Sequence, residues 1–193
     1  MKMALGEMSG LAFAGLRFTL AALILLAVLK WREGSVGAPR EAWWPLAWMG
    51  VLSNTLYQVF FMYGLTHTSV ANASLIVATT PLIVAFLGAA TGIEALRRPV
   101  VTGGLLGFSG VALILAGKGA ELGVGRLAGD AAVFGATLCW AVFTLGVRAL
   151  RVRISTLRLT TWTMVTGAPG LLLLGAPSLG ALDWGGLSAR AWS

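Results

Sequence analysis

The stretch that most constrains the fold is an uncharged run from Ser69 to Gly92, which ends just before Glu94. Because an α-helix rises about 1.5 Å per residue, this run can cross a hydrocarbon layer of about 30 Å. Small residues recur on one face of this helix at steps of three and four, namely Ala71, Ser74, Ala78, Pro81, Ala85 and Gly88. Helices in lipid associate by close backbone approach, so this face predicts a tightly packed transmembrane helix.

Pro81 lies near the middle of this helix and has no N–H to donate to the carbonyl of Val77. The freed carbonyl must accept from a neighbouring helix, from a hydroxyl such as that of Thr79 or Thr80, or from water in a cavity. Because Asn72 and the two threonines are close by, we expect a helix that is kinked at Pro81 and lines a polar cavity. The alternative is a kink whose free carbonyl is satisfied locally by Thr80.

Further apolar runs of similar length fill the rest of the chain, in which 58% of the residues are hydrophobic and 11% are charged. No soluble domain of this length needs so much apolar surface, so the pattern predicts an all-α polytopic membrane bundle. The predicted spans are 9–29, 43–64, 69–92, 99–117, 127–147 and 156–175. Short loops favour antiparallel neighbours.

The net charge of +7 does not indicate nucleic-acid binding, because the cations lie between the apolar runs and form no basic face. Most of them fall in the first, third and fifth connections, as Lys30, Arg32, Arg40, Arg97, Arg98, Arg148, Arg151 and Arg153. By the positive-inside rule these connections are cytoplasmic. The first span would then enter from outside, so we expect an amino terminus that is truncated or started internally.

Polar residues inside the spans are the candidates for a binding site. Asn54, Tyr57 and Gln58 lie at spacings of three and four near the middle of the second span. Amides in hydrocarbon are costly unless they are hydrogen-bonded, so this face either recognises a substrate or joins helices. Trp140 lies near the middle of the fifth span, where its ring can stack on a ligand or pack in the core.

Three charged residues lie within or beside the spans. Arg17 is inside the first span, where we expect a structural pairing rather than a site for a carboxylate. Glu94 is expected at the inner interface, fixing the end of the kinked helix. Asp130 begins the fifth span, where a carboxylate suits a helix amino terminus. A proton relay through either acid is the alternative.

The fourth span contains Gly103, Gly107 and Gly110, which predict a glycine face for helix packing. No motif for a catalytic centre, a metal ion or a phosphate-binding loop occurs in the sequence. The single cysteine, Cys139, lies within an apolar run, so no disulfide framework is expected. We therefore expect no enzyme, no cofactor and no metal.

An internal repeat links the first and sixth spans. Met8-Ser-Gly-Leu-Ala-Phe13 resembles Ile154-Ser-Thr-Leu-Arg-Leu159, and each motif opens a span. The two spans are an odd number apart, so the copies have opposite orientations in the membrane. Inverted repeats of this kind recur in secondary transporters, with the substrate site near the midplane between the halves.

Several stretches resemble the signature of EamA-type proteins of the drug/metabolite transporter superfamily. They are Gly64-Leu65, Thr68-Ser-Val-Ala-Asn-Ala-Ser-Leu75, Thr80-Pro81, Glu94, Arg17-Phe18, and Gly129-Asp130 through Trp140-Ala141. The resemblance implies ten helices in two inverted five-helix repeats, which move small organic metabolites across the bacterial cytoplasmic membrane by alternating access. On that alignment, residues 1–117 hold most of the first repeat without its first helix, and residues 118–193 hold the start of the second.

The resemblance also implies a central cavity formed by helices that include the family's third, fourth and sixth. Carried over to this sequence, the substrate-binding residues are Asn54, Tyr57, Gln58, Asn72, Thr80 and Trp140. Pro81 would be the hinge that lets one repeat move against the other.

The sequence thus predicts a secondary transporter or exporter of a small, polar or amphipathic metabolite. Its partners would be that substrate and membrane lipid, with a homodimer or a missing second half left open and no nucleic acid. One alternative is a non-transporting helical half that needs a partner. The other is an integral membrane enzyme acting on lipid, which would need clustered acids or histidines that the sequence lacks.

Overall fold

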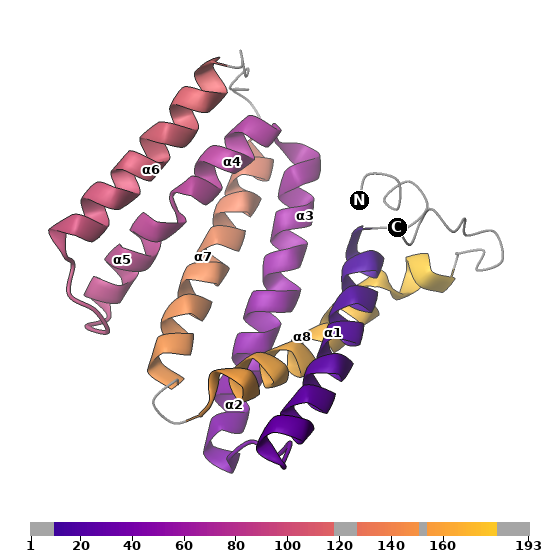
Figure 1. Cartoon of the computed structure of the whole chain (residues 1–193). Helices are drawn as coiled ribbons and strands as arrows, with labels where there is room; N and C mark the ends of the chain where they lie inside the picture. Colours follow the sequence, from indigo (N-terminus) through magenta and orange to yellow (C-terminus); the bar gives the residue numbers. More distant parts are fainter. Residues whose placement is uncertain (1–9, 118–126, 151–153, 181–193) are drawn as a thin grey trace. The chain divides into compact units, whose positions relative to one another are not determined.

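The computed structural model describes residues 10–117, 127–150 and 154–180 (Figure 1). The elements are α1 (Gly10–Glu33), α2 (Arg40–Gly50), a π-helical segment (Val51–Leu56), α3 (Tyr57–His67), α4 (Val70–Ala78), α5 (Thr80–Ala90), α6 (Arg98–Gly117), α7 (Leu127–Leu150) and α8 (Thr156–Gly180). These helices confirm the all-α prediction for the described part of the chain. Met8 and Ser9 of the repeat motif lie outside it.

Four of the described helical stretches are long and apolar enough to cross a membrane, judged by length and composition. They are Gly10–Glu33, Val70–Ala90, Leu127–Leu150 and Thr156–Ser178. A shorter apolar helix covers Arg98–Ile114. The predicted second span, 43–64, forms α2, the π-helical segment and α3 in direct succession.

The helices divide into two compact units. The described part of the first unit contains α1, α2, the π-helical segment and α8. The second unit, Val59–Val152, contains most of α3 together with α4, α5, α6 and α7.

In the first unit, α8 packs against α1, α2 and the π-helical segment. Glycines allow the backbones to approach closely: a Cβ added to Gly167 would lie 2.4 Å from the carbonyl oxygen of Gly50. Side chains bond across the same contact, since Asn54 Nδ2 donates to the Thr163 carbonyl at 2.9 Å and the Thr55 hydroxyl to the Gly167 carbonyl at 2.9 Å. Close backbone approach with interhelical hydrogen bonds is the packing expected of helices in lipid.

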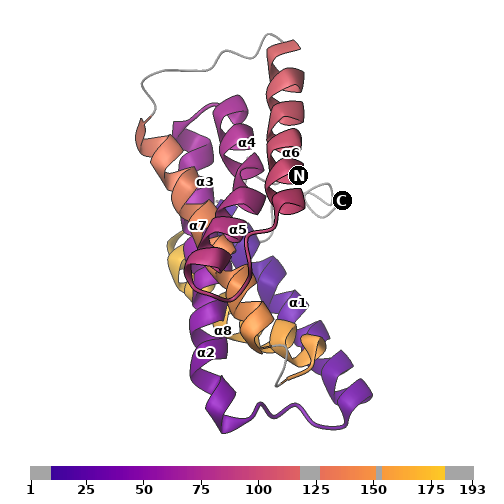
Figure 2. The same ribbon diagram turned by 90° about the vertical axis from the view of Figure 1, so that its left-hand side faces the viewer.

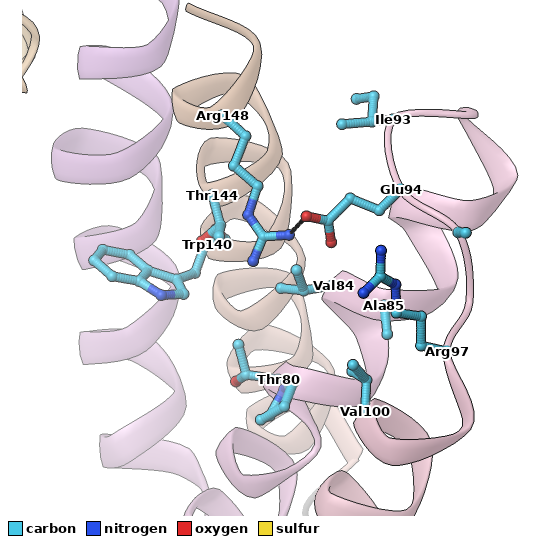
Figure 3. A pocket seen from close by; sticks show the side chains of 12 residues that line it. Thr80, Val84, Ala85, Ile93, Glu94, Arg97, Val100, Trp140, Thr144 and Arg148 are labelled. Atoms are coloured by element: carbon cyan, nitrogen blue, oxygen red, sulfur yellow. Dashed lines mark hydrogen bonds and ion pairs between the residues drawn. The ribbon is translucent and has the colours of Figure 1, made fainter. Parts of the chain in front are cut away.

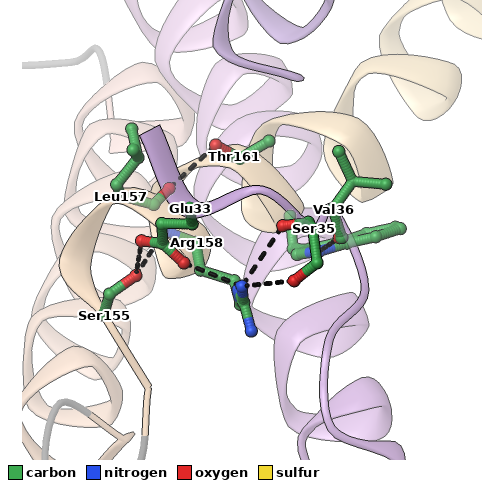
Figure 4. A network of polar contacts seen from close by, with 8 residues as sticks. Glu33, Ser35, Val36, Ser155, Leu157, Arg158 and Thr161 are labelled. Carbon is green, nitrogen blue, oxygen red and sulfur yellow. Dashed lines mark hydrogen bonds and ion pairs between the residues drawn. The ribbon is translucent and has the colours of Figure 1, made fainter. Parts of the chain in front are cut away.

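A polar network joins the end of α1 to the start of α8 (Figure 4). Glu33 forms a 2.8 Å ion pair with Arg158 and accepts from the Ser155 hydroxyl at 2.5 Å. Arg158 also donates to the carbonyl and hydroxyl oxygens of Ser35, at 3.2 and 3.1 Å. These contacts bring the first connection beside the chain that enters α8, which agrees with placing the first and fifth connections on one side of the membrane.

In the second unit, α7 packs against α4 and α5, and α6 lies along the same two helices (Figure 2). Val84, Ala141 and Leu145 form a buried cluster between α5 and α7. A Cβ added to Gly64 would lie 2.5 Å from Val133 Cγ2, so α3 approaches α7 closely at that point.

The predicted helix 69–92 is broken where Pro81 indicated, with α4 ending at Ala78 and α5 beginning at Thr80 (Figure 1). The Thr80 hydroxyl donates to the Val77 carbonyl, and the Thr79 hydroxyl donates to the Ile76 carbonyl at 2.6 Å. The local alternative for the freed carbonyl is therefore confirmed. Pro81 lacks the N–H that would donate to the Val77 carbonyl, and the Thr80 hydroxyl donates to that carbonyl in its place.

Two features of the helices differ from the sequence predictions. The helix over 43–64 contains a π-helical turn at Val51–Leu56, which changes the angular spacing of its side chains. The glycine face predicted in the fourth span has no neighbour in the described part of the chain: a Cβ added to Gly103, Gly107 or Gly110 would meet no described atom within 4 Å, so its role in helix packing stays a prediction. On this helix Gly104 is the glycine close to α5, because a Cβ added to it would lie 2.6 Å from Leu82 Cδ2. Glycine spacing reports which residues share a face but not which face has a neighbour.

Candidate functional site

A cavity of about 800 Å³ lies within the second unit, between α5, α7 and the connection that leads into α6 (Figure 3). Its volume is in the range of small-molecule sites. It is lined by Thr80, Pro81, Val84, Ala85, Ile93, Glu94, Ala95, Arg97, Val100, Trp140, Thr144 and Arg148.

The helical walls of this cavity follow from residue spacing. On α7, Trp140, Thr144 and Arg148 recur at every fourth position, so they share one face. On α5, the exposed Pro81 stands at the helix start, and the buried Ala85 follows one turn later. The part of the small-residue face near Pro81 thus opens on the cavity, whereas Gly88, further along α5, lies against Leu145 of α7.

Charged side chains gather at one end of the cavity (Figure 3). Gly92, at φ +69°, makes the left-handed turn after α5, and the Glu94 N–H donates to the Gly88 carbonyl at 3.0 Å. This turn directs the Glu94 carboxylate to an ion pair with Arg148 of α7. Arg97 lines the same cavity, and Figure 3 shows its guanidinium near this pair. Glu94 thus links the chain after α5 to α7, while its role in fixing the end of α5 stays a prediction.

We expect the Glu94–Arg148 pair to contribute little to folding, because both side chains are 42% exposed. Exposed pairs couple by about 1 kcal/mol or less. The check is a double-mutant cycle of Glu94→Gln and Arg148→Gln, measured as the free energy of unfolding in detergent. A coupling energy above about 2 kcal/mol would contradict this prediction and indicate a desolvated pair.

A second polar cluster in the same unit joins the start of α4 to the start of α7. Asp130, in the first turn of α7, accepts from the Thr68 hydroxyl and from the Asn72 amide, which lies 3.3 Å from each carboxylate oxygen. Ser69 caps α4 by accepting from the Asn72 N–H at 3.0 Å. A Cβ added to Gly129 would lie 2.5 Å from the carbonyl of His67. These contacts connect the start of α4 to the start of α7, and none of the residues in the cluster lines the cavity.

The structure thus brings together Thr80, Pro81, Glu94 and Trp140 among the predicted site residues. Asn72 and Asp130 bind each other elsewhere in the same unit. Asn54, Tyr57 and Gln58 belong to the first unit, where the Asn54 amide is bonded to α8. Arg17 has an exposed side chain whose guanidinium lies 5.1 Å from the ring of Phe18.

Sequence reasoning missed Arg97, Thr144 and Arg148 as cavity residues. The signal for two of them was present, since Thr144 and Arg148 continue the helical face of Trp140. The partner of Arg148 could not be read from the sequence, because Glu94 is held there by a turn on a different helix. Across residues 10–117, 127–150 and 154–180, no group of three His, Cys, Asp or Glu side chains gathers to hold a metal ion.

Comparisons with known proteins point to one family. The model of the EamA-like transporter family matches residues 1–116. The chain is 30% identical over 178 residues to the uncharacterized transporter YyaM of Bacillus subtilis, covering 90% of this chain and 58% of that protein. An uncharacterized transporter of Archaeoglobus fulgidus is 30% identical to this chain over 145 residues. The match covers 75% of this chain and 50% of the length of that protein.

The uncharacterized transporter YetK of Bacillus subtilis is 27% identical to this chain over 157 residues. The match covers 80% of this chain and 48% of the length of that protein. The chain therefore spans about half the length of the curated relatives it matches. No solved structure matches the chain significantly.

Proposed function

This chain belongs to the EamA-like transporter family, and from that premise we propose that it takes part in secondary transport of small organic metabolites by alternating access. The family consists of transporters rather than enzymes, and the chain is an integral membrane protein with several apolar spans. We assign residues 1–117 to most of a first five-helix repeat and residues 118–193 to the start of an inverted second one. The family match over residues 1–116 supports the first boundary.

The observation that most directly supports this proposal is the cavity of about 800 Å³ within the second unit. A cavity of this size among membrane helices can hold a metabolite, and its mixed lining provides both apolar surface and hydrogen-bonding groups. Trp140 and Thr80, both predicted from the sequence to contact substrate, line it. We propose these two side chains as substrate contacts.

The side-chain amides of Asn54 and Asn72 are proposed to be structural and not to contact substrate. Asn54 and Asn72 donate to Thr163 and Asp130, so we assign them to holding helices together. Tyr57 and Gln58 stay predictions as substrate contacts, and Gln58 is buried at 8% exposure.

Pro81 is proposed as the hinge. The break at Thr79 separates α4 from α5, and the carbonyls next to the break accept from the hydroxyls of Thr79 and Thr80. A change in this bend would move α5 at the wall of the cavity while those carbonyls stay bonded, which is the kind of local movement that gating needs.

The proposed location is the cytoplasmic membrane of a bacterium, with the odd-numbered connections inside. The Glu94–Arg148 pair joins the third connection to the end of α7, and Asp130 joins the second connection to the start of α7. These contacts support the alternation of sides, and the cation-rich odd connections support their cytoplasmic placement. We also propose that the chain assembles either with a second copy of itself or with a separate second half of the transporter. Chemical crosslinking of the chain in membranes would reveal either partner.

The test of transport uses proteoliposomes that contain the chain and are preloaded with a defined mixture of amino acids, nucleosides, sugars and carboxylic acids. Mass spectrometry of the outer solution measures which solutes leave faster than from empty liposomes. We expect Trp140→Ala to lower that flux up to about tenfold, because a lost aromatic contact costs roughly 0.5–1.5 kcal/mol.

The matched control is Trp44→Ala, since the Trp44 side chain is 82% exposed on α2. This variant is expected to leave the flux unchanged. Flux that is absent with the unaltered chain would contradict the transport proposal, and flux unaffected by Trp140→Ala would remove the cavity from it.

A further inference from the structure

We propose that the cavity in the second unit selects an organic anion, with Arg97 binding its carboxylate and Trp140 contacting its apolar body. The inference rests on the proposed function, because it names the class of solute that the same cavity takes.

The charges that line the cavity are unequal. Two guanidinium groups, those of Arg97 and Arg148, face one carboxylate, that of Glu94. Arg148 is engaged with Glu94 in an ion pair. Within the described part of the chain, no ion pair joins Arg97 to a carboxylate. The cavity therefore has an excess positive charge at the end where Figure 3 shows these three side chains together.

The hydroxyls of the cavity cannot serve as donors to an anion. The Thr80 hydroxyl donates to the Val77 carbonyl, and the Thr144 hydroxyl donates to the Trp140 carbonyl at 2.8 Å. With their protons used, both oxygens are left as acceptors. Recognition of a negative group thus falls to the Arg97 guanidinium, whose planar fork matches a carboxylate.

The start of α6 favours the same ligand charge. The helix begins at Arg98, and Val100 in its first turn lines the cavity. Helix amino termini carry partial positive charge, which adds to the guanidinium and disfavours a cationic solute. Away from this end, the lining includes Val84, Ala85 and the 43% exposed Trp140, which offer surface to an apolar or aromatic body.

The experiment compares an acid with its neutral amide of nearly the same shape. Radiolabelled phenylacetate is bound at equilibrium to the purified full chain in lipid nanodiscs, and phenylacetamide is used as competitor. We expect the acid to bind about tenfold more tightly than the amide, the size of a charge-assisted hydrogen bond. Arg97→Gln should abolish this preference, and Arg97→Lys should keep part of it.

The matched control is Arg98→Gln, which removes a neighbouring guanidinium outside the cavity lining. It should leave the acid preference intact. Equal binding of the two probes, binding of neither, or a preference that survives Arg97→Gln would each overturn the inference.

The flux assay separates this inference from the transport proposal. Flux confined to neutral or cationic solutes, without preference for the acid, overturns the anion site and leaves transport standing. Acid preference that depends on Arg97, without flux of any solute, supports the anion site and contradicts transport.

Discussion

Gly167→Ala is expected to lower the free energy of unfolding by about 2–3 kcal/mol, at the upper end of overpacking effects. The new Cβ would lie 2.4 Å from the Gly50 carbonyl oxygen and 2.6 Å from Asn54 Cβ. The Gly50 carbonyl is a backbone atom at the end of α2 and cannot rotate away, so α8 must shift from the end of α2. That shift would also strain the Asn54–Thr163 hydrogen bond. Unfolding of the purified chain in mixed detergent micelles measures the change.

The matched control is Gly107→Ala on α6, where an added Cβ would meet no described atom within 4 Å. Alanine is a better helix former than glycine, so this variant should be neutral or stabilised by up to about 1 kcal/mol. Equal destabilisation by the two substitutions would show that the close contact at Gly167 does not account for the effect.

Asp130→Ala is expected to lower the free energy of unfolding by about 3 kcal/mol. Asp130 accepts from the Thr68 hydroxyl and from the Asn72 amide, and hydrogen bonds to charged groups contribute roughly 1.5–3 kcal/mol. Without the carboxylate, both part-buried donors lose their acceptor and the start of α7 is released from α4. Thermal unfolding of the purified chain, followed by tryptophan fluorescence, is the measurement.

Two further variants separate the hydrogen bonds from the helix dipole. Asp130→Asn keeps one acceptor oxygen and should lose less stability than Asp130→Ala. Glu41→Ala removes an exposed carboxylate from the first turn of α2 and should cost only about 0.5 kcal/mol. If Glu41→Ala were as damaging as Asp130→Ala, the interhelical contacts would not be the cause.

Local features of the sequence predicted the helices well. The apolar runs gave the positions of the helices, Pro81 marked the break between α4 and α5, and Asp130 lies in the first turn of α7. Each of these depends on interactions within a few residues, such as a missing N–H or a carboxylate at a helix start.

Features that depend on neighbouring helices were not predictable. Gly167 and Gly103 look alike in the sequence, yet of these two only Gly167 lies close to another helix in the part of the chain that the structure describes. The ion pairs of Glu33 with Arg158 and of Glu94 with Arg148 join distant segments, and the π-helical turn lies where its helix meets α8. The candidate site was therefore found in part: Trp140 and Thr80 by polarity within a span, but not Arg97.

The hydroxyls that donate within their own helix have a consequence for biogenesis. Side chains such as Thr19, Thr137, Thr144 and Thr161 each donate to the carbonyl four residues earlier. A helix with this arrangement can leave the insertion machinery and enter lipid with those groups already neutralised. The Asn54 and Asn72 side chains donate to Thr163 of α8 and to Asp130 of α7, so these two bonds form only after the later helix has been synthesised.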